Sequence, residues 1–131
     1  MSWFQKTQQP EDIWEVADDQ PMGDIEAAQK IRAIVNSARA IAETIAKLGG
    51  RNAESEKAAQ TARYQAAVKR ALEITKQISD DQMRDVSVSQ IIELSVKAGH
   101  LKTARILLRA IRSEQAQREL IAAHPDLGTD G

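Results

Sequence analysis

Residues 91–105 read Ile-Ile-Glu-Leu-Ser-Val-Lys-Ala-Gly-His-Leu-Lys-Thr-Ala-Arg. Gly99 separates two runs with helical spacing of apolar residues, and glycine readily takes the left-handed conformation with which many helices end. We therefore predict a helix that ends just before Gly99, a tight turn at Gly99-His100, and a second helix from Leu101 to Arg112. Together they form a helical hairpin.

The residues on either side extend this helical pattern. Upstream, Ser79-Asp80-Asp81-Gln82 has the form of a capping box, which starts the first helix of the hairpin. Downstream, Ser113 caps a further helix that ends near Ala123, because Pro125 disfavours helical backbone in the residue before it.

Two longer helices are predicted before the hairpin. Apolar residues spaced three and four apart predict a helix from Asp24, as its N-cap, to about Leu48. The next helix begins at a cap provided by Asn52 or Ser55 and runs to Ile78. The sequence thus predicts an all-α chain of about five helices in antiparallel hairpins.

Part of this pattern repeats. Ile78-Ser79-Asp80 is followed 33 residues later by Ile111-Arg112-Ser113, and a period near 33 or 34 is typical of helix–turn–helix solenoids. Residues 69–122 resemble degenerate tetratricopeptide repeats, because Ala98-Gly99-His100, Leu101 and Ala104 are similar to the family's Ala-Gly-Asp, Leu and Ala. The resemblance implies a right-handed stack of hairpins with a concave groove for peptides or helices. The residues themselves leave an ordinary helical bundle open.

Length and composition indicate the domain organisation. The chain has 131 residues, of which 42% are apolar and 28% charged, which suits one globular domain rather than a disordered chain. We predict a single helical domain over residues 24–124. An acidic flexible arm over residues 1–23 precedes it, and a disordered tail over residues 125–131 follows it.

Several classes of site have no support in the sequence. There are no cysteines for disulfides or thiolate metal sites, and the two histidines lie in different predicted elements. The sequence also has no glycine-rich loop of the kind that cradles phosphates. For these reasons we expect neither a metal nor another cofactor. No apolar run approaches the roughly 20 residues that span a bilayer, and residues 1–9 lack the apolar segment of a secretory signal. We therefore expect a cytoplasmic protein without a membrane partner.

Charge is distributed unevenly along the chain. Residues 1–26 carry one lysine against seven acids, whereas residues 27–118 carry 17 lysines and arginines against nine acids. Such asymmetry often marks an interaction surface, or a segment that folds against its own domain.

The acidic arm contains a short motif in which acids surround apolar residues. Its members are Glu11, Asp12, Ile13, Trp14, Glu15 and Val16. Such a motif could dock onto a partner, onto the basic body of its own chain, or onto a second copy in a homodimer. Trp14 could equally be a buried staple that covers the helices.

The helix predicted after Gly99 carries a row of cations. Lys102, Arg105, Arg109 and Arg112 are spaced three, four and three residues apart. On one helix they would fall within an arc of about 80° and form a basic ridge. The ridge could bind an acidic peptide or phosphates, and the alternative is a solvated helix face.

These features favour a non-enzymatic protein–protein interaction or assembly module, which binds a peptide or helix through its groove and basic ridge. The first alternative is a nucleic-acid-binding protein that uses the same lysine and arginines. The second is a small helical ribonuclease, because Arg118 and His124 resemble the Arg-and-His motif of small helical bundle ribonucleases.

Overall fold

The computed structural model describes residues 12–15, 22–50 and 53–128. All regular structure in these residues is helical, which confirms the all-α prediction with five α-helices. The elements are η2 (Ile13–Glu15), α1 (Asp24–Lys47), α2 (Ala53–Thr75), α3 (Asp81–Lys97), α4 (Leu101–Leu108), α5 (Glu114–Ala123) and η3 (Pro125–Gly128), of which η2 and η3 are short 3-10 helices.

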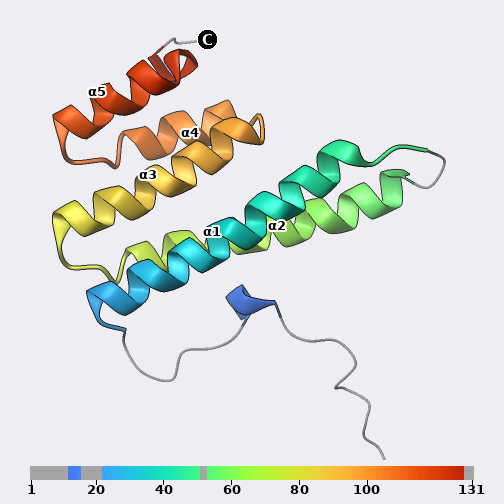
Figure 1. Ribbon diagram of the computed structural model, residues 1–131, viewed down its shortest axis with the longest axis horizontal. Coiled ribbons are helices and arrows are strands. Elements are labelled where there is room, and N and C mark those ends of the chain that lie inside the picture. Colours follow the sequence, from blue (N-terminus) through green and yellow to red (C-terminus); the bar gives the residue numbers. More distant parts are fainter. Residues whose placement is uncertain (1–11, 16–21, 51–52, 129–131) are drawn as a thin grey trace, which may run out of the picture.

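The helices form antiparallel pairs that are stacked side by side. Helices α1 and α2 form the longest pair, and α3 packs against both of them (Figure 1). Helix α4 returns along α3, and α5 and η3 lie at the far end of the stack (Figure 1). The short η2 packs on α1 and α2 from the side opposite to α3 (Figure 1).

The core consists of two apolar clusters. The larger cluster joins α1, α2 and α3, and alanines with no more than 1% exposure (Ala27, Ala38, Ala67 and Ala71) let α1 and α2 approach closely. The smaller cluster joins α3 to the C-terminal elements and consists of Val88, Ile92, Ala104, Ile111, Leu120 and Leu127. Leu107 packs against both clusters and connects them.

The loop between α2 and α3 is fixed by a carboxylate from α1. Asp24 accepts hydrogen bonds from the backbone N–H groups of Ser79 (2.9 Å) and Asp80 (3.0 Å). Asp80 then caps α3 by accepting from Met83 N at 2.8 Å. Ile78, just before these residues, is 1% exposed and anchors the loop in the core. We call this arrangement the Asp24 joint.

The loop between α4 and α5 is built in the same way. Asp85 of α3 accepts from the backbone N–H groups of Arg112 (3.1 Å) and Ser113 (3.0 Å). Ser113 caps α5 by accepting from Ala116 N at 3.1 Å, and the preceding Ile111 is 2% exposed. We call this arrangement the Asp85 joint. The repeat of Ile78-Ser79-Asp80 at residues 111–113 is thus a repeat of local structure.

Three predicted helix boundaries were wrong. Gly23 is the N-cap of α1, and Asp24 is its first residue, because the Asp24 carboxylate is engaged with the α2–α3 loop. Helix α2 ends at Thr75 rather than Ile78, since Ile78 turns into the core. Helix α4 ends at Leu108 rather than Arg112, and the same kind of turn follows it.

Residues 125–128 do not belong to a disordered tail, as the sequence had suggested. They form η3, in which Leu127 is 4% exposed and completes the smaller apolar cluster. Residues 129–131 lie outside the described part of the chain.

Candidate functional site

The four cations of the predicted basic ridge do not share one helix face. Because α4 ends at Leu108, Arg109 is its C-cap residue and Arg112 lies in the following loop. Lys102 and Arg109 are exposed, and Ile106, which is 54% exposed, lies between them in the sequence. Of the four cations, Lys102 on α4 and Arg109 at its C-cap are thus exposed.

The other two cations are held by neighbouring elements. Arg105 donates from Nη2 and Nε to the backbone carbonyl of Asp126, at 3.0 and 3.3 Å, and so ties α4 to η3. Arg112 lies with its Nε 3.8 Å from Oδ1 of Asp81, the first residue of α3. The prediction of a continuous ridge on the fourth helix is therefore wrong.

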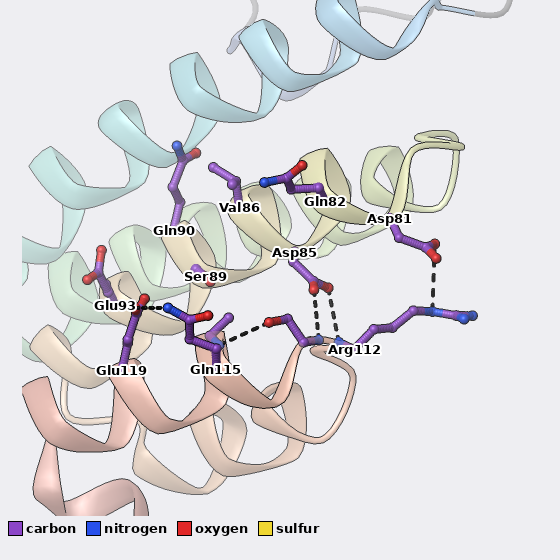
Figure 2. Close-up of a pocket in the computed structure, with 12 residues that line it drawn as sticks. Asp81, Gln82, Asp85, Val86, Ser89, Gln90, Glu93, Arg112, Gln115 and Glu119 are labelled. Atoms are coloured by element: carbon purple, nitrogen blue, oxygen red, sulfur yellow. Dashed lines mark hydrogen bonds and ion pairs between the residues drawn. The ribbon is translucent and has the colours of Figure 1, made fainter.

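A groove of about 760 Å³ lies between α3 and α5 and includes the end of the α4–α5 loop (Figure 2). We call it the α3/α5 groove. It is polar and mostly acidic rather than basic. The residues that line it are Asp81, Gln82, Asp85, Val86, Ser89, Gln90, Glu93, Arg112, Ser113, Gln115, Ala116 and Glu119.

One end of the groove is closed by internal interactions. Asp81 pairs with Arg84 as well as with Arg112. Asp85 is 7% exposed, and its carboxylate already accepts the two backbone hydrogen bonds of the Asp85 joint (Figure 2). The Asp85 carboxylate is therefore not available to a ligand, whereas Asp81 is already paired with two arginines although its side chain is 60% exposed.

The opposite end carries two accessible carboxylates (Figure 2). The Glu93 side chain is 51% exposed, and its Oε2 lies 3.8 Å from Nε2 of His124. Glu119 is also exposed and accepts a hydrogen bond from Gln115 Nε2 at 3.2 Å. Because these contacts are long or involve a neutral amide, both carboxylates can still accept hydrogen bonds from a bound cation.

The α3 wall of the groove holds two features that a folded protein usually avoids. Gln90 Oε1 is buried but accepts no hydrogen bond within the described residues. Val86, one turn earlier on the same helix, is 52% exposed. The Gln90 carboxamide points toward α1 and away from α5 (Figure 2), so of these two features it is the Val86 side chain that a ligand can reach.

The acidic arm contacts its own chain at a different place from the basic ridge. Trp14 is 6% exposed and belongs to the larger apolar cluster, and Arg63 of α2 lies over its ring at 5.8 Å. Asp12 forms an ion pair with Arg63 at 2.8 Å. Among the sequence alternatives, these contacts correspond to Trp14 as a buried staple on α1 and α2.

The structure describes the remaining residues of the arm motif only in part. Ile13 is 39% exposed, and Glu15 is the last residue of η2. Glu11 and Val16, also predicted as docking residues, lie outside the described part of the chain.

The residues of the ribonuclease alternative have separate partners. Arg118 pairs with Glu114 at 3.3 Å, with both side chains strongly exposed, whereas His124 faces Glu93. Neither contact brings the two residues together. Among the described residues, no cluster of three or more His, Cys, Asp or Glu side chains could hold a metal ion.

The fold and the groove define a class: an all-α protein of stacked antiparallel hairpins with a polar groove between α3 and α5. Comparison with protein-family models, curated proteins and solved structures gives no match for this chain. Within the described ranges, none of the helices is both long and apolar enough to cross a membrane.

Proposed function

We propose that this protein is a non-enzymatic protein-interaction module, and that its α3/α5 groove binds a basic peptide segment. The observation that carries the proposal is the pair of exposed carboxylates, Glu93 and Glu119, at the open end of the α3/α5 groove. An extended basic peptide has the cationic side chains that pair with such carboxylates.

Electrostatics favour a basic peptide over an acidic one. Four carboxylates and one guanidinium line the groove. Arg112 lies beside Asp81 at the other end of the groove, and Glu93 and Glu119 are the charged lining residues at the open end. A lysine or arginine placed there would form charge-assisted hydrogen bonds, whereas an acidic side chain would be repelled.

The groove also provides contacts that do not depend on charge. Gln82 and Gln115 are exposed and present carboxamides, which can both donate to and accept from a peptide backbone. The exposed Val86 provides an apolar contact for one side chain of the peptide. The resemblance of residues 69–122 to tetratricopeptide repeats supports the same reading, because grooves of that family take peptides.

The test uses two fluorescein-labelled peptides of equal length, one with alternating Lys and Leu and one with alternating Glu and Leu. Fluorescence anisotropy at moderate ionic strength should show saturable binding of the Lys peptide and none of the Glu peptide. The double variant Glu93→Gln, Glu119→Gln should bind the Lys peptide about tenfold more weakly, because two charge-assisted contacts are lost.

A matched control removes two exposed carboxylates elsewhere. Glu26→Gln on α1 combined with Glu54→Gln on α2 changes the net charge by the same amount and should leave the affinity unchanged. Equal loss in both double variants would mean that the Lys peptide is held only by overall charge, and the proposal would be rejected.

The alternative, that the protein binds nucleic acid, is tested by a separate titration. Titration with single-stranded RNA and duplex DNA at low ionic strength should show no binding, because the four cations of the predicted ridge do not share one helix face. Binding that is lost in a Lys102→Gln, Arg109→Gln variant would favour the alternative instead.

A further inference from the structure

A second cleft, separate from the α3/α5 groove, lies where α1, α2 and the C-terminal end of α3 meet. Its volume is about 430 Å³, within the range of small-molecule sites. Ile45, Leu94 and Ala98 form part of an apolar surface inside it. We call it the α1/α2/α3 cleft.

Cationic side chains from three helices surround this apolar surface. Arg39 comes from α1, Lys57 from α2 and Lys97 from α3, and Glu43 is the one carboxylate among the lining residues. Lys57 and Lys97 lie 40 residues apart in the sequence, so the fold brings them to the same cleft. The local charge is positive, whereas the α3/α5 groove is acidic.

Two buried polar atoms in this cleft have no hydrogen-bond partner in the described residues, namely Tyr64 Oη and Arg39 Nε. Tyr64 is 3% exposed, and its ring is fixed edge-on against the His100 ring at a centroid distance of 5.3 Å. The Arg39 guanidinium is oriented by a hydrogen bond from Nη1 to Asn36 Oδ1 at 2.9 Å. Arg39 Nε is a donor that lacks an acceptor, and the Tyr64 hydroxyl, which lies near the Ser95 side chain, can donate as well, so acceptor atoms of a ligand suit both groups.

The end of α3 does not counteract this positive charge. A helix C-terminus with open carbonyl groups would repel an anion. Here the N–H groups of Ala98, Gly99 and His100 donate to the carbonyls of Leu94, Val96 and Ser95, at 3.0, 3.0 and 2.8 Å. The turn at Gly99, with φ of +83°, makes this closure geometrically accessible.

We propose that the α1/α2/α3 cleft binds a small amphipathic organic anion, with its carboxylate at Arg39, Lys97 and the Tyr64 hydroxyl and its alkyl chain on Leu94 and Ala98. A carboxylate offers several acceptor sites to Arg39 Nε and the Tyr64 hydroxyl and is attracted by the cations. A single alkyl chain of about eight carbons suits a cleft of this size and loses contact with water on binding.

Three probes with the same alkyl chain and different head groups provide the test. Octanoate, octanol and octylamine are titrated separately into the full chain below their micelle-forming concentrations, followed by calorimetry and by methyl NMR of Ile45 and Leu94. Octanoate should saturate with a 1:1 stoichiometry and shift these methyl signals. It should bind about tenfold or more tightly than octanol, because only octanoate is charge-paired.

Variants identify the head-group contacts. Arg39→Gln combined with Lys97→Gln should weaken octanoate binding about tenfold and leave octanol binding unchanged. The matched control is Arg32→Gln with Lys69→Gln, two exposed cations outside the cleft, which should not change octanoate affinity. Tyr64→Phe keeps the ring and should weaken octanoate several-fold while circular dichroism stays unchanged.

The proposal is overturned if octylamine binds as tightly as octanoate, if the control variant loses as much affinity as the cleft variant, or if octanoate produces no saturable shift. Rejection of anion binding at the α1/α2/α3 cleft would leave the peptide-binding proposal for the α3/α5 groove unaffected. The Glu93→Gln, Glu119→Gln variant should bind octanoate normally, because neither residue lines this cleft.

Discussion

Among single residues, Tyr64 combines a tightly packed ring with a hydroxyl group that has no hydrogen-bond partner in the described chain. Burial raises the pKa of Tyr64 above its ordinary value of 10.0, and the nearby Ser95 side chain offsets only part of this rise. The Ser95 hydroxyl itself donates to Ile91 O at 2.9 Å. The phenol is therefore held neutral in the folded protein.

This raised pKa predicts alkaline destabilisation. Above pH 10.0 the unfolded state loses the Tyr64 proton first, so the free energy of unfolding should fall as pH rises, until pH exceeds the folded-state pKa. Relative to Tyr64→Phe, the loss should reach at most about 1.4 kcal/mol per pH unit. Urea unfolding of both proteins from pH 8 to 11.5 measures it. Parallel pH profiles for the two proteins would contradict the prediction.

Asp24 has the opposite pH dependence. The backbone hydrogen bond from Ser79 is the largest cause that lowers the pKa of Asp24 below 3.8, with Asp80, the Ser79 hydroxyl and Arg84 acting in the same direction. The stabilisation is therefore present above the unfolded-state pKa and is lost as pH falls through the lower folded-state pKa.

Replacing Asp24 with Asn should abolish this dependence. At pH 6 the Asp24→Asn variant should have the lower free energy of unfolding, and the difference from the natural protein should shrink between pH 4 and pH 2. Chemical denaturation at several acidic pH values measures the difference. A difference that is constant with pH would show that the carboxylate charge does not matter in the Asp24 joint.

Single positions differ in how well the sequence predicts them. Gly99 was identified from the sequence because glycine tolerates the positive φ that the turn requires, and its φ is +83°. The unsatisfied atoms of Tyr64, Arg39 and Gln90 were not identified. Their state depends on neighbours from other helices, and a sequence pattern carries no information on these.

At the scale of helices and loops, the Asp85 joint makes a quantitative prediction. Replacing Asp85 with Ala removes the acceptor of two backbone N–H groups and should lower the free energy of unfolding by about 1–3 kcal/mol. Asp85→Asn keeps one acceptor oxygen and should lose about half as much. Urea denaturation monitored by circular dichroism measures both losses.

The control for this prediction is Glu43→Ala, an exposed acid on α1. Its effect should stay within about 0.5 kcal/mol, as for most surface substitutions. If Asp85→Ala has an equally small effect, water replaces the carboxylate at no cost and the joint does not stabilise the fold.

The helices were largely predictable, but their ends were less so. The cap at Ser113 and the turn at Gly99 are local signals, and the structure confirms both. The local sequence does not indicate where α4 ends, because Arg109 and Ala110 are good helix formers. Burial of Ile111 and the two hydrogen bonds to Asp85 outweigh that propensity and turn the chain early.

At the scale of the whole molecule, the two apolar clusters predict uneven stability. Helices α1 and α2 share the larger cluster, whereas α5 and η3 depend on the smaller one. Native-state hydrogen exchange should therefore show α5 opening at a lower free energy than α1 and α2. Leu120→Ala should weaken protection in α5 by about 2–3 kcal/mol without changing α1.

Uniform protection across all helices would contradict this view. It would show that Leu107, which packs against both clusters, couples them into one cooperative unit. Ile74→Ala in the larger cluster is the matched comparison and should lower protection in α1 and α2 without changing the protection of α5.

The surface of the whole molecule was harder to predict than its helices. The lysine and arginines at positions 102–112 were placed on one face because a helix to Arg112 was assumed. The early turn after Leu108 sends Arg112 into the α3/α5 groove, where four acids outnumber it. The charge of a groove depends on which helices meet there, so the net charge of a sequence segment could not predict it.

The repeated joints also define a unit for protein engineering. Residues 79–111 start just after one buried isoleucine, Ile78, and end on its counterpart, Ile111. A tandem copy of this segment inserted after Ile111 would present its own Ser79 and Asp80 N–H groups to the first Asp85. The second Asp85 would then receive Arg112 and Ser113, so the chain could be lengthened one hairpin at a time with every connector retained.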